Sequence, residues 1–234
     1  MVIVLQYTGI RAVSYHGAYM RSVILLSLIL CPLFAQSPQP RTEEERAAEM
    51  KRRVIETLQL RPGDTAADVG CGDGFYTIPL ARFLGPSGKL YAEDISDAAL
   101  IKLKEHLGKE GLKNVEVIKG AEDDPKLPAD RLDAVLIVNS YHEMTAHEAM
   151  LRHVRDALKP GGTFVLMEGI WDSREAQSRD EQIKHHQLAP QLAKAEVQSA
   201  SFEIVELRDP FLVRAPDEDG KSRWWLIIAR KPAR

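Results

Sequence analysis

Cysteine is scarce in this chain: Cys31 and Cys71 are the two cysteines among 234 residues. No cysteine cluster is therefore present that would support a structural zinc site. An excess of charge of one sign is also lacking, because 31 basic and 34 acidic side chains leave a formal net charge of −3. This balance argues against an electrostatic grip on nucleic acid, and a hydrophobic content of 44% argues against disorder.

A hydrophobic run long enough for a comfortable membrane span is missing as well. The longest candidate, residues 23–34, has about twelve residues, whereas a span needs about 20. Arg21 precedes this run, and Ala35 with a stretch rich in Pro, Gln and Ser follows it. A basic start, a short apolar core and a small residue are typical of a secretory signal. We therefore expect residues 1–35 to be a signal peptide, with Met20 as a second candidate start of translation.

An uncleaved N-terminal membrane anchor is the alternative interpretation of this segment. The chain is accordingly expected to be periplasmic, secreted or anchored at its N-terminus, and cytoplasmic if the segment is not a functional signal. Removal of residues 1–35 would leave Cys71 as the one cysteine, so that no intramolecular disulfide could form. Residues 36–234 are long enough for one domain with a well-buried core.

The most informative segment that is present is residues 65–74, which reads as a buried strand followed by a glycine-rich turn. Gly70, Gly72 and Gly74 occupy every second position. Glycine lets the backbone turn sharply and approach a ligand where a Cβ atom would clash. A helix predicted over about residues 75–84 would point its free N–H groups at the same ligand.

Spacing and charge indicate which ligand this turn holds. A dinucleotide-binding fingerprint has the pattern G-x-G-x-x-G, whereas Phe75 stands here where the third glycine is required. Asp68 and Asp73 flank the turn. Their carboxylates would repel a pyrophosphate, but they suit a ligand that carries an amino group and a sulfonium. An NAD(P)-binding oxidoreductase of similar fold is the disfavoured alternative.

At residues 68–74 the chain resembles the class I S-adenosylmethionine (SAM)-dependent methyltransferases, whose first motif is an acidic residue followed by G-x-G-x-G. Further segments match this family in order. They are residues 89–96, a strand that ends in acid; residues 114–125, a strand and an acidic loop; residues 132–144, an apolar strand followed by Asn-Ser-Tyr-His-Glu-Met; and residues 151–168, a helix, a tight turn and a strand. The resemblance extends over about residues 43–231.

This resemblance implies a Rossmann-like α/β fold. The expected architecture is a three-layer α/β/α sandwich around a mostly parallel seven-stranded sheet with an antiparallel last strand. SAM is the implied cofactor, with Asp94 placed to accept hydrogen bonds from both ribose hydroxyls. The residues expected to bind the cofactor are Asp68, Gly70, Cys71, Gly72, Gly74, Asp94, Ile95, Ala121, Glu122, Asp123 and Asn139.

Methyl transfer is an in-line displacement that needs positioning, exclusion of water and, for a protonated nucleophile, a base. We expect His142 to act as base or substrate ligand, with Tyr141 and Glu143 shaping the pocket; the alternative is that His142 only packs. The acceptor is expected to be a small organic molecule methylated on O, N or C. A methyltransferase-like protein that binds a ligand without catalysis remains a third hypothesis, and the oligomeric state is left open.

No metal site is expected from the sequence. His185 and His186 are adjacent, and neighbouring residues on a helix do not share a face. Two local patterns predict helix starts: capping boxes at Thr42–Glu45 and at Thr145–Glu148. Ser96 is expected to cap a further helix.

Overall fold

A seven-stranded sheet organises the part of the chain that the computed structural model describes, residues 42–213 and 222–233. The predicted signal peptide, residues 1–35, lies outside this range. The strands are β1 (Thr65–Val69), β2 (Lys89–Asp94), β3 (Val115–Lys119), β4 (Leu132–Val138), β5 (Leu158–Trp171), β6 (Glu203–Val213) and β7 (Ser222–Arg230). Their order is β3-β2-β1-β4-β5-β7-β6. Among these strands β7 alone runs in the reverse direction, antiparallel to both β5 and β6, while the other pairs are parallel. The predicted fold is therefore confirmed.

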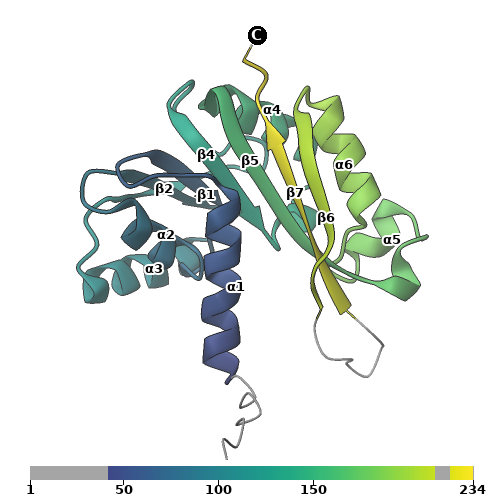
Figure 1. Cartoon of the computed structure of the whole chain (residues 1–234), viewed down its shortest axis with the longest axis horizontal. Helices are drawn as coiled ribbons and strands as arrows, with labels where there is room; N and C mark the ends of the chain where they lie inside the picture. The colour runs from purple at the N-terminus through teal and green to yellow at the C-terminus, as the bar shows by residue number, and fades with distance from the viewer. Residues whose placement is uncertain (1–41, 214–221, 234) are drawn as a thin grey trace, which may run out of the picture. The chain divides into compact units, whose positions relative to one another are not determined.

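Helices cover both faces of this sheet (Figure 1). They are α1 (Glu43–Thr57), α2 (Thr77–Leu84), α3 (Asp97–Glu110), α4 (His147–Ala157), α5 (Arg179–Ile183) and α6 (Pro190–Ser199), with short 3₁₀ turns at Tyr141–Glu143 and Asp172–Arg174. Alternate residues of each strand point to opposite faces, which explains the two separate cores. Ala66 and Leu136 pack with α1 and α2, whereas Ala67 and Ile137 pack with α4 and α6.

Local capping chemistry explains where two of the helices begin. The Thr42 side chain accepts a hydrogen bond from the backbone N–H of Glu45, and the Glu45 side chain accepts one from the N–H of Thr42. Ser96 caps α3 by accepting from the N–H of Ala99. Both predictions are confirmed.

The capping box predicted at Thr145–Glu148 is wrong. Helix α4 begins at His147, and its N-cap residue, Ala146, makes no side-chain cap. The reason is the 3₁₀ turn Tyr141–Glu143, after which Met144 is extended. The chain therefore enters the helix later than the Thr-x-x-Glu pattern suggests, and Glu148 is left exposed.

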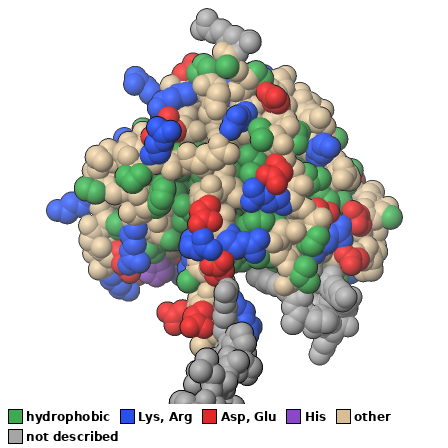
Figure 2. Space-filling model, viewed as in Figure 1, with side chains coloured by type: hydrophobic (Ala, Val, Ile, Leu, Met, Phe, Trp, Pro, Cys, Tyr) green, Lys and Arg blue, Asp and Glu red, His purple; other side chains and the backbone are tan. Residues whose placement is uncertain are grey.

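The face of the molecule in Figure 2 carries basic and acidic side chains interspersed, without a large patch of either sign. Among the described residues, no helix has the length and apolar character needed to cross a membrane. Ligands of open α/β sheets bind outside the carboxyl ends of the strands, so the candidate site is expected there.

Candidate active site

The glycine-rich turn follows β1 directly and can be built only from glycine at two positions. Gly70 has a φ of +69°, and a Cβ atom there would lie 2.3 Å from Oγ of Ser140. Gly74 has a φ of +103°, and its Cβ atom would lie 2.7 Å from a methyl carbon of Leu103. Backbone strain and lack of space thus combine at both positions. This close packing holds the turn against the loop after β4 and against α3.

Asp94 connects the glycine-rich turn to the loop after β2. One carboxylate oxygen accepts a hydrogen bond from the N–H of Gly72 at 2.8 Å, and the other accepts one from the N–H of Ser96 at 2.7 Å. A carboxylate offers about four lone-pair positions, so two remain for a ligand. Asp94 is therefore fixed in place and still able to bind hydroxyl groups.

Two other carboxylates lie beneath the turn. Asp68 is buried at the end of β1, where burial raises its pKa to about 6 although the hydroxyl of Thr77 donates to it at 2.6 Å. Burial likewise raises the pKa of Glu93 to about 8, and the N–H of Gly70 approaches its Oε2 at 3.4 Å. The floor of the turn is thus rich in acidic groups that have little contact with solvent.

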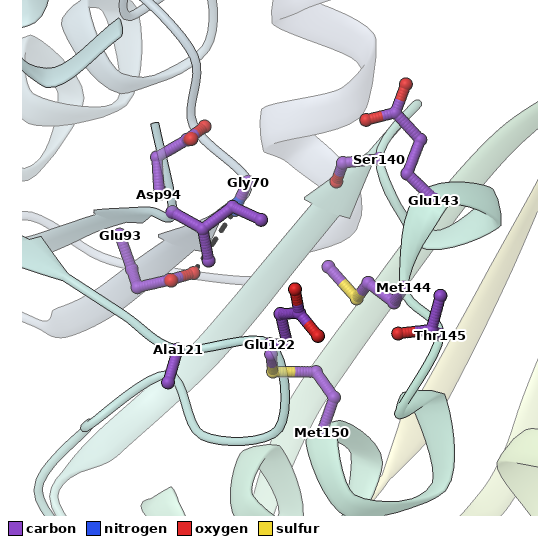
Figure 3. Close-up of a pocket in the computed structure, with 11 residues that line it drawn as sticks. Gly70, Glu93, Asp94, Ala121, Glu122, Ser140, Glu143, Met144, Thr145 and Met150 are labelled. Atoms are coloured by element: carbon purple, nitrogen blue, oxygen red, sulfur yellow. Dashed lines mark hydrogen bonds between the residues drawn. The ribbon is translucent and has the colours of Figure 1, made fainter. Parts of the chain in front are cut away.

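A cavity of about 160 Å³ lies at the carboxyl ends of β1, β2 and β4. Strand order reverses between β1 and β4, and ligands in open α/β sheets bind at such a switch point. The lining residues are Gly70, Glu93, Asp94, Ile95, Ala121, Glu122, Ser140, Glu143, Met144, Thr145 and Met150. In Figure 3 the acids of β2 lie on one side of this space, and Glu143 and the two methionines lie on the other.

The structure brings some of the predicted site residues to this cavity and leaves others outside it. The predicted residues in its lining are Gly70, Asp94, Ile95, Ala121, Glu122 and Glu143. Asp123 and Asn139 are exposed and do not line it. Gly72 and Gly74 belong to the turn itself and Asp68 lies beneath it, and these three residues do not line the cavity.

Cys71 and Tyr141 also lie outside the cavity lining. Cys71 is buried with leucines of α3, and burial raises the pKa of its thiol, so it is not a ready nucleophile. Tyr141 is fully buried in the core, and its hydroxyl donates to Glu196 at 2.8 Å. The expectation that Tyr141 shapes the pocket wall directly does not match this placement, because its ring points into the protein.

His142 is buried beside Glu168, which lies in β5. The distance from His142 Nδ1 to Glu168 Oε2 is 2.8 Å. Glu168 Oε1 accepts hydrogen bonds from the backbone N–H groups of Tyr141 and His142, at 2.8 and 3.3 Å. Burial alone would lower the pKa of His142, but the hydrogen bond and charge of Glu168 outweigh it and raise that pKa. Glu168 therefore fixes both the turn and the orientation of the imidazole.

Sequence reasoning missed Glu168 and Glu93 as site residues. A signal for Glu168 was available, because it is the one charged residue in the run Thr163 to Ile170 of an otherwise apolar strand. A charged side chain in a central strand is costly unless it is paired. Its partner could not be identified without the fold, since His142 lies on a different element.

Comparison with known proteins agrees with this geometry. The sequence profile of a family described as a methyltransferase domain matches residues 66–162. These residues therefore match a methyltransferase domain. They contain the glycine-rich turn, the acidic strand ends and the loop that carries His142, so the match agrees with the predicted class I SAM-dependent methyltransferase.

Several curated methyltransferases are similar to about half of this chain. The chain is 30% identical over 123 residues to demethylmenaquinone methyltransferase of Geobacillus stearothermophilus, and this alignment covers 53% of each protein. It is 31% identical over 119 residues to the ubiquinone/menaquinone biosynthesis C-methyltransferase of Ectopseudomonas mendocina, which covers 50% of this chain and 46% of that protein. The chain thus matches about half the length of these curated relatives.

Solved structures of low sequence identity share the fold of this chain. A SAM-dependent methyltransferase from Aquifex aeolicus superposes with a TM-score of 0.62 at 20% identity, covering 81% of this chain and 99% of that one. The [4+2]-cyclase SpnF superposes with a TM-score of 0.69 at 18% identity, covering 86% of each chain. Since the second is titled a cyclase, this fold likeness does not by itself define a reaction.

Proposed function

We propose that the whole chain is an enzyme that transfers a methyl group from SAM to a small organic acceptor. The observation that carries this proposal is the cavity at the β1/β4 switch point, whose lining includes the acidic residues Asp94, Glu122 and Glu143. The methyltransferase domain supplies the cofactor site, and the loop after β4 supplies the acceptor side.

The charge of the cavity suits SAM. Asp94 and Glu122 line it, and a sulfonium and an ammonium group are attracted to carboxylates in a partly enclosed site. A dinucleotide pyrophosphate would be repelled by the same groups. This electrostatic preference favours SAM over NAD(P).

The outer side of the cavity suits a compact acceptor. Met144 and Met150 offer flexible apolar contacts, while Ser140, Thr145 and Glu143 offer polar ones. In the reaction, an electron pair of the acceptor atom forms a bond to the methyl carbon as the C–S bond breaks and its electrons stay on sulfur, and the proton that the acceptor atom carried is released to a nearby base or to solvent. Holding the two reactants in line can supply about 7–11 kcal/mol of the barrier reduction.

Quinone-type molecules are the first acceptors to test, because the curated relatives are named for demethylmenaquinone and for ubiquinone or menaquinone biosynthesis. The matched region holds the cofactor turn rather than the C-terminal segment beyond residue 162. The acceptor-binding part of this chain can therefore differ from that of the relatives.

Isothermal titration of the full chain with SAM, S-adenosylhomocysteine and NADH tests the cofactor. We expect micromolar binding of the two adenosyl ligands and none of NADH. Failure of both adenosyl ligands to bind would refute the proposal, and NADH binding would favour the oxidoreductase. Transfer of radiolabelled methyl groups to reduced quinones and other small phenols then tests turnover; SAM binding without transfer to any of them favours the non-catalytic alternative.

We also propose that residues 1–35 direct export or anchor the protein in a membrane, leaving residues 36–234 as one domain. The apolar run 23–34 after Arg21 supports this. Cell fractionation combined with mass spectrometry of the N-terminal peptide tests it. A cytoplasmic protein that retains residues 1–35 would contradict the proposal, whereas an N-terminus near Gln36 in an exported fraction would support cleavage.

A further inference from the structure

His142, Glu143 and His186 bring three potential metal ligands together at the rim of the cavity. One ligand atom from each residue lies within 4.8 Å of the other two. Oε1 of Glu143 is 3.6 Å from Nε2 of His142 and 3.3 Å from Nδ1 of His186. Tetrahedral zinc with bonds of about 2.0–2.1 Å holds its ligand atoms about 3.3 Å apart. Two separations are therefore already close to those around a bound ion.

The nitrogen of His142 that faces this cluster is buried and has no hydrogen-bond partner. The side chain is only 1% exposed, and the 3.6 Å distance to Glu143 is too long for a hydrogen bond. In the neutral ring, Nδ1 donates to the carboxylate of Glu168, which lies 2.8 Å away, and Nε2 then presents a lone pair. A cation at Nε2 would supply the interaction that this buried atom lacks.

Glu168 completes an arrangement that proteins use to orient metal-binding histidines. Such a histidine donates its other ring N–H to a carboxylate or carbonyl, which fixes the tautomer and makes the ligand nitrogen more basic. Glu168 is fully buried and is itself held by the N–H groups of Tyr141 and His142. The imidazole of His142 is therefore oriented before any ligand arrives.

His186 is presented by a turn with a well-defined backbone. It has a φ of +55°, which is uncommon for a residue with a side chain. The buried Gln182 holds this turn: its backbone carbonyl accepts from the N–H groups of His185 and Gln187, and its side-chain Oε1 accepts from the N–H of Ala189. The His186 side chain is 74% exposed, so it can rotate to close the remaining gap.

The local charge favours a cation. Glu143 and Glu168 place two carboxylates around His142. The positive charge of Arg179 also acts on His142, but the Nε of Arg179 is paired with Glu196 at 2.8 Å. A divalent ion would therefore be balanced by the two carboxylates.

We propose that His142, Glu143 and His186 bind one divalent transition-metal ion of the zinc class. Two imidazoles and one carboxylate are ligands that zinc accepts, and three protein ligands leave a fourth position open. Glu143 also lines the cavity, which places the ion at the edge of that cavity. If the proposed function holds, as this step of the inference requires, the fourth coordination position would bind an oxygen atom of the methyl acceptor.

The structure thus uses only one histidine of the adjacent pair. The sequence argument that His185 and His186 do not bind one metal together is compatible with this site. The expectation that the chain has no metal site conflicts with the proposal. His185 and His186 lie in the turn after α5 rather than on a helix, and the three residues of the cluster do not include His185. His185 is exposed, which makes it a matched control.

Titration of the untagged, chelator-treated full chain with Zn²⁺ alone tests the proposal. We expect one ion per chain by calorimetry, and Co²⁺ is expected to give the visible absorption bands of a four-coordinate site. His186→Ala and Glu143→Gln should each weaken Zn²⁺ binding at least tenfold, while His185→Ala should leave it unchanged. Both altered side chains are exposed, so folding is not at risk as it is with His142→Ala.

Three results would overturn the metal site: no Zn²⁺ binding by the unaltered chain, undiminished binding by His186→Ala, or an equal loss in His185→Ala. SAM titration of the same proteins separates the two proposals. SAM binding without Zn²⁺ binding overturns only the metal site. Zn²⁺ binding without SAM binding overturns the proposed methyl transfer and leaves the metal site supported.

Discussion

The Oε2 atom of Glu168 accepts a hydrogen bond from Nδ1 of His142 at 2.8 Å, and both side chains are buried. Strand β5 supplies the carboxylate, and the 3₁₀ turn after β4 supplies the imidazole. Because β4 and β5 are paired in parallel, their carboxyl ends meet at the same edge of the sheet. The pair sets which nitrogen of His142 faces the candidate site.

Glu168→Gln tests this orientation. The amide oxygen can still accept from the backbone N–H groups of the turn, but the amide NH₂ group would donate to Nδ1. The ring proton then moves to Nε2, which can no longer bind a metal. We expect Zn²⁺ affinity to fall by about 10- to 100-fold in calorimetry. SAM affinity should be unchanged, because Glu168 does not line the cavity; unaltered Zn²⁺ affinity would contradict the assigned orientation.

Asp94→Ala is expected to weaken SAM binding. The substitution removes the acceptors for Gly72 and Ser96 together with the proposed contacts to the ribose hydroxyls. Hydrogen bonds to charged groups contribute about 1.5–3 kcal/mol, which corresponds to about a 10- to 100-fold change in affinity. Asp123→Ala is the control, since Asp123 is an exposed acid outside the lining. Equal losses in the two variants would show a general charge effect instead.

Gly70→Ala is expected to destabilise the fold and abolish SAM binding. The control is Gly161→Ala, because Gly161 has a φ of +80° but nothing within 4 Å of the added Cβ. The control should cost about 1 kcal/mol through backbone strain. Gly70→Ala should cost about 1–3 kcal/mol more, because the Cβ atom clashes with Ser140. Urea unfolding measures both values, and equal costs would mean that Ser140 moves aside freely.

Glu93 is expected to make stability fall as pH rises. Burial raises its pKa to about 8 in the folded chain, with further increases from the charges of Asp94, Asp68 and Asp124. The folded state therefore holds a proton that the unfolded state releases near its ordinary pKa of about 4.3. The contribution of Glu93 is most favourable below that value and is lost as pH approaches about 8.

Urea unfolding between pH 5 and pH 9 tests this expectation. The midpoint should decrease over this range for the unaltered chain, and Glu93→Gln should reduce the decrease because the amide does not titrate. Asp68, whose pKa burial raises to about 6, contributes in the same direction at lower pH. Saturating SAM should also reduce the decrease if its positive charge stabilises the ionised carboxylates. A midpoint that rises with pH would contradict the assignment.

Much of the fold and of the cofactor turn could be predicted because the relevant interactions are local. The Ser96 cap and the Thr42–Glu45 box each depend on residues within a few positions. The φ of +69° at Gly70 is likewise a local backbone property that glycine favours, although its close contact with Ser140 is not local. The box at Thr145 fails for the opposite reason. The packing of the preceding turn against Glu168, in a distant strand, decides where α4 begins.

The sequence by itself determined the alternation of strands and helices and the position of the glycine-rich turn, and it predicted the class of cofactor and the strand ends where a ligand is expected to bind. Periodicity, glycine spacing and acidic residues at strand ends are sufficient for these, because backbone conformation and charge act over short stretches of chain. Only the tertiary structure decided that Tyr141 turns into the core while His142 meets Glu168 and His186. These contacts depend on the order of the strands and on a turn held by Gln182, so no local pattern records them.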